Sequence, residues 1–80
     1  MNREENVRRL REKFKKGTRI KLIEMFNEPQ MTHGLIGNVS HVDDVGQVHV
    51  NWSNGSTLAL NVDLDDFEIY DKKNYKDEYL

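Results

Sequence analysis

Residues 34–60, GLIGNVSHVDDVGQVHVNWSNGSTLAL, carry the strongest structural signals in this 80-residue chain. Two apolar-rich runs flank a turn at residues 43–46, and a run of alternating apolar and polar residues leads into a second turn at residues 53–56. Asn-Gly between alternating strands is a strong hairpin signal, because a type I′ turn needs positive φ at both central residues. The pattern therefore predicts a three-stranded antiparallel meander.

The central strand of this meander has the clearest alternation. Its predicted inward side chains are Val48, Val50 and Trp52. Its predicted outward side chains are Gln47, His49 and Asn51. Trp52 is interpreted as a core residue rather than a ligand platform, because it continues the inward series. In the preceding strand, Val39 and Val42 can both face the core only if a bulge near Ser40 and His41 shifts the alternation.

On the N-terminal side, residues 3–16 are predicted to form a helix. Asn2 with Glu5 three residues later resembles a capping box, and Gly17 can adopt the left-handed conformation that ends a helix. The narrow apolar side of this helix consists of Val7, Leu10 and Phe14. The helix is therefore expected to lie against the edge of the β domain.

The remaining elements follow from composition. The chain is predicted to contain a first strand at 18–26, a polar loop at 27–33, a fourth strand at 57–60, one 3₁₀ turn at 61–66 and a short fifth strand at 67–70. Gly34 and Gly37 indicate a bend or a close approach in the second strand. The expected fold is mainly β, an SH3-like five-stranded small barrel with an added N-terminal α-helix. Residues 1–16 are expected to form the basic helix, 17–70 the barrel and 71–80 a flexible charged tail.

Composition and charge narrow the possible classes. The chain lacks cysteine, which excludes disulfides and thiolate metal sites and fits a cytoplasmic protein. No export signal or membrane-spanning run is expected from the sequence. The net charge is −2, yet residues 1–16 hold seven basic and three acidic side chains. This uneven distribution favours either a charged partner or attraction between the basic head and the acidic C-terminal part.

Several short motifs resemble those of a known family. They are Gly17-Thr18-Arg19, residues 25–29, Gly34 with Gly37 and Val39, Val42-Asp43-Asp44 through Gly46, and Val50 through Gly55 with Leu58-Ala59-Leu60. Over roughly residues 17–70 they resemble domain of unknown function family 4314. The resemblance implies a small protein of bacteria, phages or other mobile elements, and it implies no particular activity. The run VNWSNG also resembles the Trp-acid-Asn-Gly hairpin of protein-binding SH3-like modules, with Ser53 in place of the acid.

Catalytic and metal-binding chemistry are not indicated. Ser40 and His41 are neighbours on a strand and so point to opposite faces, which does not suit a nucleophile and its base. A hairpin centred on Val45 would set His41 opposite His49, but two imidazoles without a third ligand make a weak metal site. Solvated histidines are the preferred interpretation, and neither a catalytic residue, a metal nor a cofactor is expected.

The predicted function is that of a non-enzymatic interaction module that binds protein. Its predicted contact residues are Met31, His33, Gln47, His49 and Asn51. One alternative is a nucleic-acid-binding accessory protein that uses the basic helix. The residues of that alternative are Arg8, Arg9, Arg11, Lys15 and Lys16. A third possibility, suggested only by the family resemblance, is a phage or mobile-element inhibitor that occludes a host defence protein.

Overall fold

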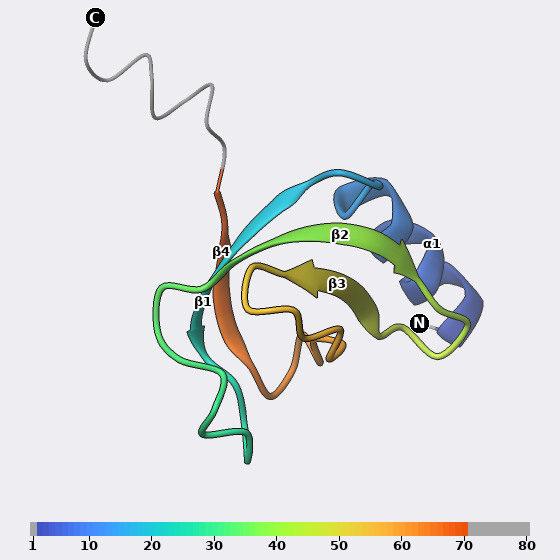
Figure 1. Cartoon of the computed structure of the whole chain (residues 1–80). Helices are drawn as coiled ribbons and strands as arrows, with labels where there is room; N and C mark the ends of the chain where they lie inside the picture. Colours follow the sequence, from blue (N-terminus) through green and yellow to red (C-terminus); the bar gives the residue numbers. More distant parts are fainter. Residues whose placement is uncertain (1, 71–80) are drawn as a thin grey trace, which may run out of the picture.

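The chain folds into one helix and one antiparallel sheet. The computed structural model describes residues 2–70, and the tail predicted at 71–80 lies outside them. The elements are α1 (Arg3–Lys13), β1 (Arg19–Glu24), β2 (Ile36–Val42), β3 (Val48–Trp52) and β4 (Asp66–Ile69). The strands pair in the order β3-β2-β1-β4, and α1 lies beside the end of β2 (Figure 1). The chain is mainly β, as predicted.

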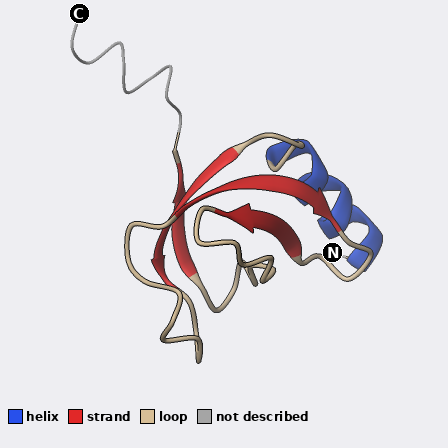
Figure 2. Cartoon of the chain, viewed as in Figure 1, coloured by secondary structure: helices blue, strands red, loops and turns tan. Residues whose placement is uncertain are grey.

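The sheet does not close into the predicted five-stranded barrel. Residues 57–60 form no strand, and Leu60 pairs with β3 only through an isolated bridge to Val48. The reason is the indole of Trp52, whose Nε1–H donates to the carbonyl oxygen of Leu58 at 2.9 Å. The N–H of Leu58 donates instead to the hydroxyl of Ser56 at 3.2 Å. Side chains thus engage the backbone that a fourth strand would need, and this segment stays a loop (Figure 2).

Both turns of the meander end in a glycine with positive φ. In each, the glycine N–H donates to the carbonyl three residues earlier, and φ is 88° at Gly46 and 89° at Gly55. These features identify a three-residue loop built on a type I turn with a G1 bulge. The predicted type I′ geometry is therefore wrong, because φ is not positive at Asn54. Its side chain accepts a hydrogen bond from the Ser56 N–H at 3.0 Å.

The predicted bulge in β2 is confirmed. The pairing of β2 with β3 shifts between Val39 and His41, and Val39 and Val42 are both buried. The same shift places His41 directly opposite His49.

A second irregularity lies near the end of β1. The register with β4 shifts between Leu22 and Glu24. Leu22 and Met25 are consequently both buried, while Ile23 faces solvent. This irregularity gives the end of β1 an exposed apolar side chain.

Helix α1 begins as predicted but ends at Lys13 rather than Lys16. The Asn2 side chain accepts the Glu5 N–H at 2.8 Å, which caps the first turn. Phe14 leaves the helical conformation, with φ −111° and ψ 70°. Its buried ring then packs 5.8 Å from the ring of Phe67, so core packing decides where the helix ends.

The helix packs on the β2–β3 turn. Val7 is buried, and Leu10 lies over Gly46 of that turn. Arg11 fastens the contact, because its Nε donates to the Val42 carbonyl at 3.1 Å and its guanidinium lies 2.8 Å from an Asp44 carboxylate oxygen. The expected position at the edge of the β domain is confirmed.

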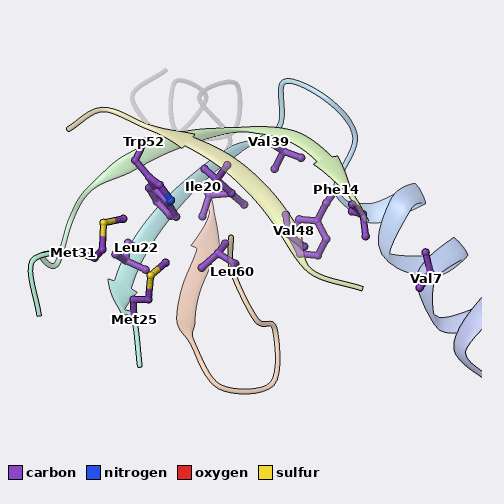
Figure 3. Close-up of a cluster of buried hydrophobic side chains, with 12 residues drawn as sticks. Val7, Phe14, Ile20, Leu22, Met25, Met31, Val39, Val48, Trp52 and Leu60 are labelled. Carbon is purple, nitrogen blue, oxygen red and sulfur yellow. The ribbon is translucent and has the colours of Figure 1, made fainter. Parts of the chain in front are cut away.

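The core lies on the face of the sheet that carries Trp52 (Figure 3). Ile20, Leu22, Val48 and Leu60 are fully buried, and Trp52 is only 4% exposed. The prediction that Trp52 is a core residue is therefore confirmed. Figure 3 also shows Met25 and Met31 near Leu22 at the end of the core away from α1.

Among residues 2–70, no helix combines the length and apolar character needed to cross a membrane.

Candidate functional site

The five predicted contact residues do not form one surface. Met31 and His33 belong to the β1–β2 loop, where the Met31 sulfur accepts a hydrogen bond from Asn54 at 3.6 Å, next to the turn that follows β3. Gln47 and His49 lie at the opposite end of β3, beside the β2–β3 turn. The antiparallel pairing of β2 and β3 thus separates the loop residues from the start of β3.

Met31 is a core residue. Its side chain is only 3% exposed, so it cannot act as a surface contact by itself. His33, by contrast, is exposed. The loop therefore places a polar side chain at the surface and a flexible apolar one beneath it.

A groove of about 450 Å³ runs between the end of β1 and the β1–β2 loop. Its apolar lining comes from Ile23, Met25, Pro29 and Met31. Its polar lining includes Glu24, Glu28 and His33. Methionine suits such a surface, because its unbranched, polarisable side chain adapts to different neighbours. The groove can thus accommodate an apolar side chain while its rim contacts polar groups.

Backbone hydrogen bonds hold the loop that forms one wall of the groove. The N–H of Met31 donates to the Glu28 carbonyl at 2.9 Å, and the N–H of Gly34 donates back to Leu22 of β1 at 2.7 Å. Asn27 has φ of 59°, a left-handed conformation that few residues other than glycine adopt. Such a backbone persists only where surrounding structure enforces it, and it is common at binding sites.

Exposed apolar and acidic side chains surround the groove. Ile23 is 38% exposed and Phe26 is 56% exposed. The N–H of Phe26 donates to an Asp65 carboxylate oxygen at 2.8 Å. This contact brings the acidic turn before β4, residues 61–65, beside the loop. Asp66 lies opposite Glu24 in the β1–β4 register. This end of the molecule therefore combines apolar surface with negative charge.

The outer face of the sheet forms a second polar surface. Arg19 lies opposite Asn38, and Asn38 lies opposite Asn51, so the three side chains form a row across β1, β2 and β3. Next to this row, the rings of His41 and His49 stack at 4.4 Å between centroids and 4° between planes. The face can donate and accept hydrogen bonds.

His49 is tied to the β2–β3 turn. Its Nε2 lies 2.8 Å from an Asp43 carboxylate oxygen. The other oxygen of Asp43 accepts the N–H groups of Val45 and Gln47. The hydrogen bond with His49, followed by that from Gln47, lowers the pKa of Asp43 from 3.8 to about 2.

This hydrogen bonding predicts an acid-sensitive hairpin. Because the pKa of Asp43 is lower in the fold than in the unfolded chain, its contribution to stability is complete above pH 3.8 and is lost as pH falls towards about 2. Asp43→Asn is expected to make the unfolding midpoint less dependent on pH across this window, as measured by denaturant titrations at a series of pH values. His49→Ala removes the main cause and should flatten the dependence as well. Equal slopes in the wild type and both variants would contradict this account.

The predicted nucleic-acid residues have different roles. Arg11 is engaged in the contact between α1 and the β2–β3 turn, where two acidic residues, Asp43 and Asp44, lie close by. Within residues 2–70, no ion pair or hydrogen bond engages the side chains of the other four. These four are Arg8, Arg9, Lys15 and Lys16, and all are exposed. The acids beside Arg11 reduce the positive charge that this end of α1 can offer to a phosphate backbone.

The histidine pair has the predicted register but lacks a ligand set. His41 Nδ1 lies 3.0 Å from the hydroxyl of Ser40, so the expectation that these two side chains point to opposite faces is wrong, because the bulge between Val39 and His41 shifts the alternation. His49 contacts Asp43. In the part of the chain that the structure describes, no three histidine or acidic side chains gather closely enough to hold a metal ion.

Comparison with known proteins identifies a family to which this chain is similar. The profile of the family described as domain of unknown function (DUF4314) matches residues 3–70. The chain belongs to this family. The searches of curated proteins and of solved structures gave no match. In this DUF4314 protein the matched region contains α1 and all four strands of the sheet, so the helix is part of the family's domain.

Sequence reasoning found the loop of the DUF4314 groove but missed its other wall. Ile23 and Glu24 were assigned only to a strand, and Glu28 only to a connection. A charge signal could have pointed to this end, because residues 22–34 contain Glu24 and Glu28 and neither lysine nor arginine. What no pattern could show is that the turn before β4 folds back against Phe26.

Proposed function

We propose that this DUF4314 protein is a non-enzymatic interaction module that binds another protein in the groove between β1 and the β1–β2 loop. One observation carries the proposal: the groove joins a buried methionine floor to exposed apolar side chains in a single concave surface. Apolar concave surfaces with a few polar groups at the rim are typical of binding sites.

We further propose that the scaffold is an SH3-like one whose fourth strand is reduced to the bridge between Val48 and Leu60. The spatial order of the segments supports this. Leu60 pairs with the edge of β3 that faces away from β2, and β4 pairs with β1 at the opposite edge of the sheet. A protein-binding role is consistent with such a scaffold. The nucleic-acid and host-defence alternatives remain predictions.

Photo-crosslinking in the source cell tests the proposal by comparing three surfaces of one protein. A photoreactive amino acid would replace His33 at the groove, Asn51 on the outer face, or Arg8 on α1, all of which are exposed. We expect a discrete protein adduct from position 33 and none from position 8. Mass spectrometry of the adducts identifies the partner and the crosslinked position.

The other outcomes are equally informative. An adduct with nucleic acid from position 8, together with steeply salt-dependent binding to a generic duplex, would support the alternative based on the basic helix. A protein adduct from position 51 alone would move the contact surface to the outer face. Failure of position 33 to form any adduct while either other position does would reject the groove.

A further inference from the structure

The charges around the groove are uncompensated. Glu24 and Glu28 line the groove, Asp65 accepts the N–H of Phe26 beside it, and Asp66 lies opposite Glu24. Within residues 2–70, neither Glu24 nor Glu28 takes part in an ion pair. Glu28 accepts a hydrogen bond at 2.7 Å from the neutral amide of Gln30, which orients its carboxylate without neutralising it. An incoming cation would therefore meet carboxylates that have no competing positive partner.

The apolar part of the groove adds a second requirement. Of its lining residues, Met25 and Met31 are 6% and 3% exposed and Ile23 is open to solvent; Phe26, next to Met25 in the chain, is exposed outside the groove. Covering these exposed side chains would stabilise a complex, because apolar surface is removed from water. A purely charged ligand would leave this surface uncovered. The partner therefore needs an apolar side chain as well as positive charge.

Two other occupants fit less well. Nucleic acid would bring its phosphates towards the carboxylates, which repel them. The basic helix of a second copy carries the required positive charge, but Val7 is buried in its own core and Leu10 packs against that core. Neither occupant supplies a basic segment with a free apolar side chain.

We infer that the groove binds a short segment of another protein in which lysine or arginine flanks an apolar anchor residue. The anchor lies over Met25 and Met31 beside Ile23, and the basic side chains contact Glu24 and Glu28. This inference rests on the proposed function, since it specifies the partner class of the same groove. The acidic turn before β4, held to Phe26 through Asp65, extends the negative rim.

Selection from a library of random short peptides displayed on phage tests the partner class directly. We expect enriched peptides to contain lysine or arginine next to an aliphatic or aromatic residue, and to bind more weakly as salt rises. For Glu24→Gln/Glu28→Gln, fluorescence anisotropy should show about a fivefold loss of affinity, the size expected from removing two exposed ion pairs. Glu12→Gln/Glu68→Gln removes equal charge from α1 and β4, whose carboxylates lie outside the groove, and should bind like the wild type.

A further variant tests the groove as a binding site independently of the proposed partner class. Ile23→Ser/Phe26→Ser removes exposed apolar surface and should abolish binding of the selected peptides, with folding checked by circular dichroism and thermal unfolding. Enriched peptides without lysine or arginine, or equal affinity for Glu24→Gln/Glu28→Gln, would overturn the inference but leave the groove as a binding site. Selected peptides that bind Ile23→Ser/Phe26→Ser normally, or a selection that enriches none, would overturn both the inference and the proposed function.

Discussion

Trp52→Ala is expected to lower the free energy of unfolding by about 3–5 kcal/mol, the range for truncation of a large buried aromatic residue. Trp52 is 4% exposed and belongs to the cluster that joins β1, β2, β3 and Leu60. A domain of this size has a total stability near the lower end of roughly 5–15 kcal/mol. The variant should therefore be largely unfolded or only marginally folded. Denaturant titration followed by far-ultraviolet circular dichroism measures the loss without relying on tryptophan fluorescence.

Trp52→Phe is the matched control for this prediction. It keeps an aromatic ring in the core but removes the indole N–H that donates to Leu58, leaving that partly buried carbonyl without this partner. The expected cost is about 1–3 kcal/mol, smaller than that of alanine. A loss below about 1 kcal/mol for Trp52→Ala would contradict the role of the indole as the centre of the core.

Gly37→Ala is the second substitution with a large expected effect. Gly37 lies in β2 on the core face and directly opposite Trp52. A Cβ added there would overlap Val50 Cγ1 and lie 2.8 Å from Trp52 Cε3. Because an interior strand position cannot move away from both neighbours, the strain should cost about 1–3 kcal/mol or more. Thermal and denaturant unfolding measure it.

A double-mutant cycle tests the cause of this cost. In a Val50→Ala background the nearest obstructing atom is gone, so Gly37→Ala should destabilise the protein less than it does in the wild type. Asn38→Ala, at the next position of β2 but on the exposed outer face, should change stability by no more than about 0.5 kcal/mol. Additive effects of Gly37→Ala and Val50→Ala would show that the steric account is wrong.

Local patterns predicted much of the sheet correctly because its signals lie close together in sequence. The alternation of Val48, Val50 and Trp52 identified a half-buried strand, and the odd spacing of Val39 and Val42 located the bulge. The glycine at Gly37 indicated a close approach, which the structure assigns to the side chains of Trp52 and Val50. The type I′ assignment failed because Asn-Gly is compatible with more than one turn class, and only the hydrogen bonds select between them.

Only part of the candidate site could be predicted from the sequence, and the reason is different. Proline and polar side chains in residues 27–33 predict a loop. The residues that pack against such a loop, however, come from parts of the chain distant in sequence. Met31 is buried because it packs beneath its own loop next to Met25, and the acidic turn reaches Phe26 through Asp65. Neither contact has a local signature.

The sequence by itself determined the β class, the capped start of the helix and the inward face of β3. It also located the helix and the four strands that form, although not the loop at residues 57–60. Each of these features depends on spacings within a few residues. Tertiary structure alone decided that Leu58 is held by the Trp52 indole rather than by a strand and that Phe14 ends the helix. It also decided that β1 and its loop enclose a groove, and that Asp65 of the turn before β4 lies at Phe26. The physical reason is that burial and side-chain hydrogen bonds between distant residues compete with local backbone preferences. In a domain with so small a core, those distant contacts prevail at the edges of the sheet.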